Sequence, residues 1–308
     1  MVRRQILSLS ERESLLALPD DELTLTRMAY FSEQDLAFIN AHRKPASRFG
    51  FAVLLCYLKN VGFAPDKKSS PAAELLRVIG TRLKLSVELW QEYISGRDTT
   101  RREHLGELYR YLELKAFNGA LQKECIQHLL PQSTRTDRGI LIAEELLKYL
   151  HQRRIIVPGI DVVDRTCAEA MTLGDKAVYT TLNTHLSATH KSAFDALLMT
   201  TEKQISRLTW LLQPPGKING KNVLQHIDRL NAIEALALPE GVDRTVHQNR
   251  LLKLAREGRK MSSRDLADFT PARRYATMVC VQTEARATII DEHNRRGGRG
   301  KQLARSVW

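Results

Sequence analysis

Several basic side chains gather where the sequence predicts the start of a helix. Thr100 occupies an N-cap position, and Glu103 follows at the spacing of a capping box. A helix start presents unpaired backbone N–H groups and the positive end of the helix dipole, so cations are poorly placed there for the helix itself. The cluster predicts a bound anion, phosphate first; a solvated basic helix start is the alternative. Its members are Arg97, Arg101, Arg102 and His104.

A second basic cluster precedes the most apolar stretch of the chain. Residues 42–48 read His-Arg-Lys-Pro-Ala-Ser-Arg, and an apolar helix is expected over residues 49–59. We predict that both clusters contact nucleic acid; alternatively, their arginines pair with nearby carboxylates and only hold helices together. The candidate DNA-binding residues are Arg43, Lys44, Arg48, Arg97, Arg101, Arg102 and His104.

Three expected helices position the first cluster. One opens on Pro71 and ends near Gly80, a short one covers residues 87–93, and the basic helix follows the break at Ser95-Gly96. This is the layout of helix-turn-helix DNA readers, whose last helix enters the major groove by its N-terminal residues. Purely structural three-helix units share the layout, so function needs further support.

Charge and composition narrow the class of partner. The chain has 47 Lys plus Arg against 35 Asp plus Glu, a net charge of +12, which favours nucleic acid first and an anionic membrane surface second. An aromatic content of 6% argues against a platform that stacks single strands. The sequence shows neither a signal peptide nor an apolar run long enough to span a bilayer, so we expect a cytoplasmic protein without a membrane partner.

Neither the placement of the cysteines nor any known catalytic motif indicates a catalytic or metal site in this sequence. The four cysteines are scattered without a CxxC pair, so we expect buried free thiols: Cys56, Cys125, Cys167 and Cys280. The chain contains no GxxxxGK[ST], no GxGxxG after a strand and no HExxH, and His104 begins no HxxR element of a tyrosine recombinase. We therefore expect no catalytic residue, no metal site and no cofactor.

Helical periodicity without convincing strand alternation predicts an all-α fold of several small bundles in tandem. Ser8, Ser32 and Ser262 each open a helix with an acid three residues later. Turn-rich segments at 63–71, 131–139 and 214–220 suggest the boundaries. The expected parts are an N-terminal DNA-binding subdomain (1–62), a helix-turn-helix-like subdomain (71–130), helical domains at 140–213 and 221–292, and a disordered basic tail (293–308).

Several blocks, taken in order, resemble one family. Residues 27–31 (Arg-Met-Ala-Tyr-Phe), 35–39 and 48–58 resemble the N-terminal region of replicative transposases of the Tn-three type. Further similar blocks are Tyr93–Arg97, Thr100–Leu105, His226–Leu230, Leu254–Gly258 and Arg273–Ala276. The resemblance implies DNA-binding domains that recognise the terminal inverted repeats of a transposon. The resemblance stops near Asp291, and the RNase H-like catalytic domain of the family would follow, so we expect a truncated transposase. Ser47 and Phe49 depart from the Asn and Leu that the family often has.

Three readings of function stay open at this point. The first is sequence-specific binding of double-stranded DNA at transposon ends, with a second copy or an intact transposase as a further partner. The second is a helical interaction scaffold, or a competitive inhibitor of an intact transposase. The third is a self-sufficient recombinase, which would need a metal or a nucleophile. Salt-dependent duplex binding separates the first reading from a scaffold, and metal-dependent strand cleavage identifies the third.

Overall fold

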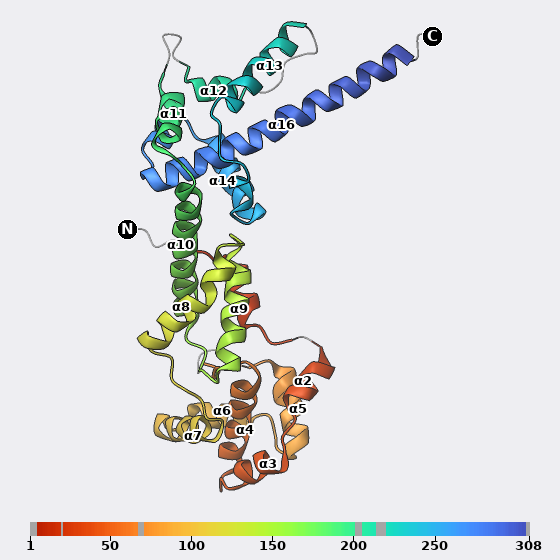
Figure 1. Cartoon of the computed structure of the whole chain (residues 1–308). Coiled ribbons are helices and arrows are strands. Elements are labelled where there is room, and N and C mark those ends of the chain that lie inside the picture. Colours follow the sequence, from red (N-terminus) through yellow and green to blue (C-terminus); the bar gives the residue numbers. More distant parts are fainter. Residues whose placement is uncertain (1–4, 20, 67–70, 201–204, 214–219, 306–308) are drawn as a thin grey trace. The chain divides into compact units, whose positions relative to one another are not determined.

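The computed structural model describes residues 5–19, 21–66, 71–200, 205–213 and 220–305 (Figure 1). Within these ranges it contains sixteen α-helices, one 3₁₀ helix and no strand, which confirms the all-α prediction. Two isolated bridges, Lys115 with Ile155 and Thr200 with Ser206, are the only β-type pairings in the same ranges. No helix among the described residues is both long and apolar enough to cross a membrane.

The chain divides into two compact units. Unit 1 comprises residues 1–129 and 138–169, and unit 2 comprises residues 130–137 and 170–308. The helices of unit 1 are α1 (Leu9–Leu16), α2 (Glu22–Met28), α3 (Glu33–Asn40), α4 (Pro45–Asn60), α5 (Ala73–Leu83), α6 (Leu89–Ser95), α7 (Asp98–Tyr111) and α9 (Gly139–Gln152). Those of unit 2 are α11 (Ala188–Leu198), α12 (Arg207–Leu211), α13 (Gly220–Glu234), η1 (Val242–Arg244), α14 (Gln248–Lys260), α15 (Ser263–Ala267) and α16 (Pro271–Arg305). Residues of α8 (Gly119–Ser133) and α10 (Ile160–Thr184) belong to both units.

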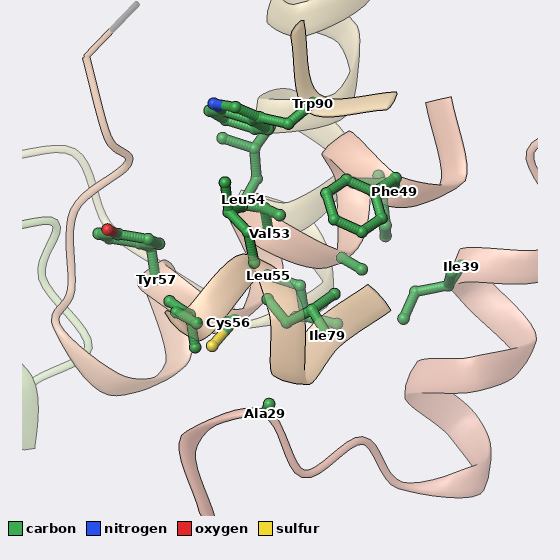
Figure 2. Packing of buried hydrophobic residues seen from close by; sticks show 14 of the residues in the cluster. Ala29, Ile39, Phe49, Val53, Leu54, Leu55, Cys56, Tyr57, Ile79 and Trp90 are labelled. Carbon is green, nitrogen blue, oxygen red and sulfur yellow. The ribbon is translucent and has the colours of Figure 1, made fainter. Parts of the chain in front are cut away.

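Helix α4 is the centre of unit 1. Every residue from Phe49 to Leu58 is buried, as expected for a helix that is apolar on all sides. Side chains of α3, α5 and α6 surround it, among them Ile39, Ile79 and Trp90 (Figure 2). Buried residues between 25 and 58 and between 75 and 108 belong to one cluster, although we expected separate subdomains at 1–62 and 71–130, because a helix that is apolar all round must be covered from several directions.

Unit 2 is built on the packing of α14 against α16 (Figure 1). Gly258 of α14 makes the close approach possible, since a Cβ there would lie 2.5 Å from Val281 Cγ2 and 2.6 Å from Thr277 Cγ2. The start of α14 is anchored by Arg250, which is 1% exposed and forms an ion pair with Asp175 of α10. A buried guanidinium needs such a partner, because an unpaired buried charge is strongly destabilising.

Three predicted helix starts are confirmed, and one differs. Ser8, Ser32 and Ser262 each cap a helix through a complete capping box. The basic helix does not start behind Thr100 but three residues earlier: α7 begins at Asp98, with Arg97 as its N-cap. The physical reason is that α6 ends at Ser95, and Gly96 leads at once into α7, where an acidic first residue suits the helix dipole.

Two expected irregular segments are also helical. Pro131 lies inside α8 rather than in a linker, and the helix ends at Ser133. Helix α16 continues to Arg305, where we expected a disordered tail from residue 293, while residues 306–308 lie outside the described ranges. Extending an existing helix fixes one residue at a time, which is far less costly than nucleating a new one. The expected linker segments 67–70 and 214–219 also lie outside the described residues.

Candidate nucleic-acid interface

The start of α4 is open and basic. Lys44 is the N-cap residue but makes no side-chain capping bond, Pro45 is the first helical residue, and the first turn holds no acid. Arg43 and Lys44 are exposed. Arg48 is half-buried, and its Nε is buried without a hydrogen-bond partner. None of these three cations forms an ion pair within the described ranges. This helix start therefore offers backbone N–H groups and three cations to an anion.

The start of α7 also offers two cations that form no ion pair with any described residue. Arg97 and Arg102 are both exposed, and neither forms a hydrogen bond or ion pair through its side chain to any described residue. The N-cap again makes no side-chain capping bond. Two guanidinium groups that point to solvent from a helix start can bind a phosphate in a bidentate manner.

Arg101 has a different role from its neighbour. It is half-buried, and its Nη2 donates a hydrogen bond of 2.6 Å to the carbonyl oxygen of Pro65. This bond ties the first turn of α7 to the segment that follows α4. Arg101 therefore combines structural anchoring with its proximity to the cluster, and its substitution should lower stability as well as any DNA affinity.

His104, a predicted DNA contact, lies in the core, where only 4% of its surface is exposed. Its Nδ1 is 3.0 Å from the Tyr93 hydroxyl, and its ring lies 4.4 Å from that of His42 and 5.3 Å from that of Phe51. Burial, together with the nearby His42, lowers the pKa of His104 to about 4. A neutral, enclosed imidazole cannot reach a phosphate in this fold, so we leave His104 out of the proposed interface.

A further basic face of α7 was not among the predicted site residues. Arg102, Gly106 and Arg110 follow each other at intervals of four, so they lie on one face of α7. Arg102 and Arg110 are exposed, and a Cβ added at Gly106 would meet nothing within 4 Å. A glycine in the middle of a helix lowers its stability by about 1 kcal/mol, and no close packing requires it here. The spacing of Arg102, Gly106 and Arg110 by four residues each could have predicted this basic face from the sequence.

The two open starts belong to the same unit. The His42 Nε2 lies 3.6 Å from Glu107 Oε2, so the start of α4 meets the second half of α7. The start of α7 meets the segment after α4 through the Arg101–Pro65 bond. The His42 ring also lies 4.4 Å from that of His104, so along α7 the two clusters are separated by at most the ten residues from Arg97 to Glu107, roughly 15 Å at about 1.5 Å per residue. That span is shorter than one turn of B-DNA, about 34 Å, so one duplex can meet both.

A third basic helix start is closed. Helix α9 begins behind Arg138, again without a side-chain cap. However, a Cβ at its first residue, Gly139, would lie 2.5 Å from the carbonyl oxygen of Ile6, so the segment before α1 covers this start. The contrast shows that an uncapped helix behind an arginine is not enough; the open starts are those of α4 and α7.

Comparison with known proteins finds one matching family model and several similar transposases. Residues 6–170 match the family model "Domain of unknown function (DUF4158)". Over 292 residues the chain is 61% identical to the transposase for transposon Tn2501 of Escherichia coli, which covers 95% of the chain and 29% of that transposase. It is 43% identical to the transposase for transposon Tn21 of Escherichia coli and 41% identical to that for Tn501 of Pseudomonas aeruginosa, each covering 95% of the chain and 30% of the relative. The chain thus spans less than a third of the length of these curated relatives.

Proposed function

The chain belongs to the DUF4158 family and corresponds to the N-terminal part of Tn-three-type transposases, and from this premise we propose that it binds double-stranded DNA at the terminal inverted repeats of a transposon. The observation that carries the proposal is the pair of open helix starts in unit 1. Arg43, Lys44, Arg97 and Arg102 are exposed there and have no ion pair within the described residues.

We propose that α5, α6 and α7 form the helix-turn-helix-like reader, with α7 as the helix that enters the major groove. Tyr93 of α6 stacks on His104 of α7, with ring centroids 5.6 Å apart, so the two helices hold each other in a fixed orientation. The buried His104 points inward, which leaves the opposite face of α7, with Arg102 and Arg110, for the bases or phosphates. The cluster before α4 is the proposed second contact, on the backbone.

Arginines elsewhere in unit 1 show why the unpaired ones stand out. Arg12 pairs with Asp164, Arg77 with Glu74 and Glu22, Arg153 with Glu124, and Arg154 with Glu113. An exposed ion pair contributes little stability, but it neutralises the cation. The cations of the open starts keep their full charge for a partner, as expected of phosphate contacts.

The test is a fluorescence-polarisation titration of the chain with a duplex that carries a terminal repeat of Tn2501, against a scrambled duplex of the same length. We expect tighter binding to the repeat and a steep loss of affinity with salt. A chain that binds neither duplex at low salt would exclude this function. Binding that does not respond to salt would favour the scaffold reading.

Single substitutions assign the contacts. Arg102→Ala should weaken binding by roughly 1–3 kcal/mol and relax the preference at one base pair if Arg102 reads a base; a phosphate contact would instead weaken all duplexes alike and reduce the salt slope by about one. The matched control is Arg77→Ala, an exposed arginine of the same unit that is paired with Glu74. Equal binding by Arg102→Ala and the parent would remove α7 from the interface.

A further inference from the structure

A hollow in unit 2 collects cationic and hydroxyl groups away from the open starts of unit 1. Its volume is about 360 Å³, and none of the described residues that line it carries a carboxylate. The polar residues of its wall are Thr134, Arg135, Thr181, Arg244, Thr245 and His247. We propose that this hollow binds a phosphate of the DNA backbone. This inference rests on the proposed function and extends it to unit 2.

Three elements of unit 2 fix the walls of the hollow. Arg135 follows the end of α8, and a Cβ at Gly174 of α10 would lie 2.7 Å from Ser133 Cβ, so the end of α8 lies directly on α10. Arg250 of α14 forms its buried ion pair with Asp175 of the same helix. Neighbouring residues of α10 thus hold both the end of α8 and the start of α14, and the hollow between them is preformed.

The charges at the hollow are unbalanced. Arg135 and Arg244 are exposed, and neither side chain has an ion pair in the part of unit 2 that the structure describes. Nearby cations are neutralised: Arg250 by Asp175, and Lys253 by Asp137 and Glu257. Arg135 and Arg244 line the same hollow from different segments of the chain, so an anion bound there is attracted by both guanidinium groups.

His247 supplies a further hydrogen-bond donor at the hollow. The Nδ1 of His247 accepts a hydrogen bond of 3.2 Å from the backbone N–H of Asn249, so a neutral ring carries its proton on Nε2 and offers it as a donor. His247 is exposed and forms the N-cap of α14, whose first backbone N–H groups face the same end. The Thr134 and Thr245 hydroxyls donate their only protons to the carbonyl oxygens of Pro131 and Val242, so these two side chains shape the wall and are not donors to the anion.

The kind of anion follows from this donor set. Guanidinium groups match the oxygens of a phosphate in a bidentate fashion, and Arg135, Arg244 and His247 are all exposed enough to meet a phosphate that is still part of a strand. An acidic protein segment is the competing occupant. Nucleic acid is favoured because the open helix starts of unit 1 present the same chemistry in the same chain.

The experiment compares the salt dependence of duplex binding for the intact chain, Arg135→Gln, Arg244→Gln and the double variant. Arg286→Gln is the matched control, since Arg286 is an exposed arginine of unit 2 that is paired with Glu234 at 3.2 Å. Each lost phosphate contact should reduce the slope of log affinity against log salt by about 0.9, and the double variant should reduce it by about 1.8. Melting temperatures should stay unchanged, because neither arginine supports a partner within the described residues.

The outcomes separate this inference from the function on which it rests. If the intact chain binds no duplex, both fall. Suppose instead that the intact chain binds duplex and Arg102→Ala reduces the slope of log affinity against log salt. If the double variant then keeps the parental slope, only the phosphate site in unit 2 is excluded. An inorganic phosphate arm tests the source of the anion. A rise in melting temperature with phosphate that the double variant loses, without any change in duplex binding, would identify a free-anion site and overturn the DNA assignment.

Discussion

Two neighbouring helix starts in unit 1 are built in opposite ways. At α3, the Ser32 hydroxyl accepts the Asp35 N–H at 3.1 Å, and the Asp35 carboxylate accepts the Ser32 N–H at 2.8 Å. At α4, five residues after α3 ends, Lys44 makes no capping bond and the first turn has no acid. The first start satisfies its backbone donors internally and serves the fold. The second leaves them open beside cations, which is costly for a helix unless an anion arrives.

The largest effect is expected from opening the closed start. Asp35 is 1% exposed and also accepts hydrogen bonds from Lys59 Nζ at 2.8 Å and from the Tyr111 hydroxyl at 2.9 Å. Burial alone would raise the pKa of Asp35, but these bonds together lower it. Asp35→Ala should reduce the free energy of unfolding by about 3 kcal/mol, because it removes the cap of α3 together with the charge-assisted hydrogen bonds from Lys59 and Tyr111.

Urea denaturation measures this loss, and Glu33→Ala, an exposed acid on the same helix, is the control. Duplex affinity below the melting temperature should stay at the parental value. Equal stability of Asp35→Ala and the parent would contradict the structural role of the closed start.

The next largest effect is a pH dependence of stability that comes from His104, on the buried side of α7. The pKa of His104 is lowered to about 4 by burial, below its ordinary value of 6.5. The unfolded chain therefore binds the proton more readily, so stability is complete above about pH 6.5 and declines as the pH falls toward 4, by on the order of 2–3 kcal/mol in total. The groups that face the ring are His42, Tyr93 and Phe51, with Glu107 beside His42.

Urea titrations at a series of pH values test this dependence. His104→Phe should flatten the decline between pH 6.5 and 4. Some dependence should persist, because burial also lowers the pKa of His42, only partly offset by Glu107. A variant with the parental slope would show that His104 is not the titrating group.

Substitutions can give the open start of α4 the capping box that α3 has. In α4 the N-cap is Lys44 and the third helical residue is Ser47, so Lys44→Ser with Ser47→Glu builds the same capping box that α1, α3 and α15 contain. Stability should rise by about 1 kcal/mol. Duplex affinity should fall, because a cation is removed and a carboxylate occupies the site of the anion. Lys44→Ser alone should lie between the two, and unchanged affinity of the double variant would exclude α4 from the interface.

The smallest effect concerns the outer face of α7. Gly106→Ala should raise the free energy of unfolding by about 0.5–1 kcal/mol, since alanine restricts the unfolded chain and meets no neighbour in the fold. The reverse case in the same unit is Gly50→Ala, whose Cβ would lie 2.2 Å from Tyr93 Cγ and which should destabilise. A loss of stability in Gly106→Ala would show that this face is covered.

The sequence was sufficient for the fold class and for the helix starts that use serine. Ser32 with Asp35 is a local pattern whose bonds close within one turn, so no tertiary information is needed. Arg97 as the N-cap of α7 was not predictable in this way, because the end of α6 at Ser95 decides where α7 begins. The division into two units also depends on long-range packing around α4.

The candidate site was only partly readable. The cations of the two open starts were found from their clustering, but their exposure depends on tertiary contacts. Arg101 and Arg102 are adjacent, yet one donates to Pro65 and the other points to solvent. His104 was wrongly predicted as a DNA contact: it lies four residues before the buried Leu108, and this helical spacing was the signal in the sequence that it belongs to the apolar face of α7.

The four buried thiols make the chain a convenient substrate for site-specific labelling. Burial raises the pKa of Cys125 to about 11 and the pKa of Cys56, Cys167 and Cys280 to about 12, so none of them is a thiolate near neutral pH. A maleimide reacts with the thiolate and needs access to it. A cysteine introduced on the surface, such as Arg102→Cys or Arg244→Cys, would therefore react alone in an otherwise native chain. A fluorophore, a spin label or a thiol-tethered oligonucleotide can be attached at either proposed contact without first replacing the native cysteines.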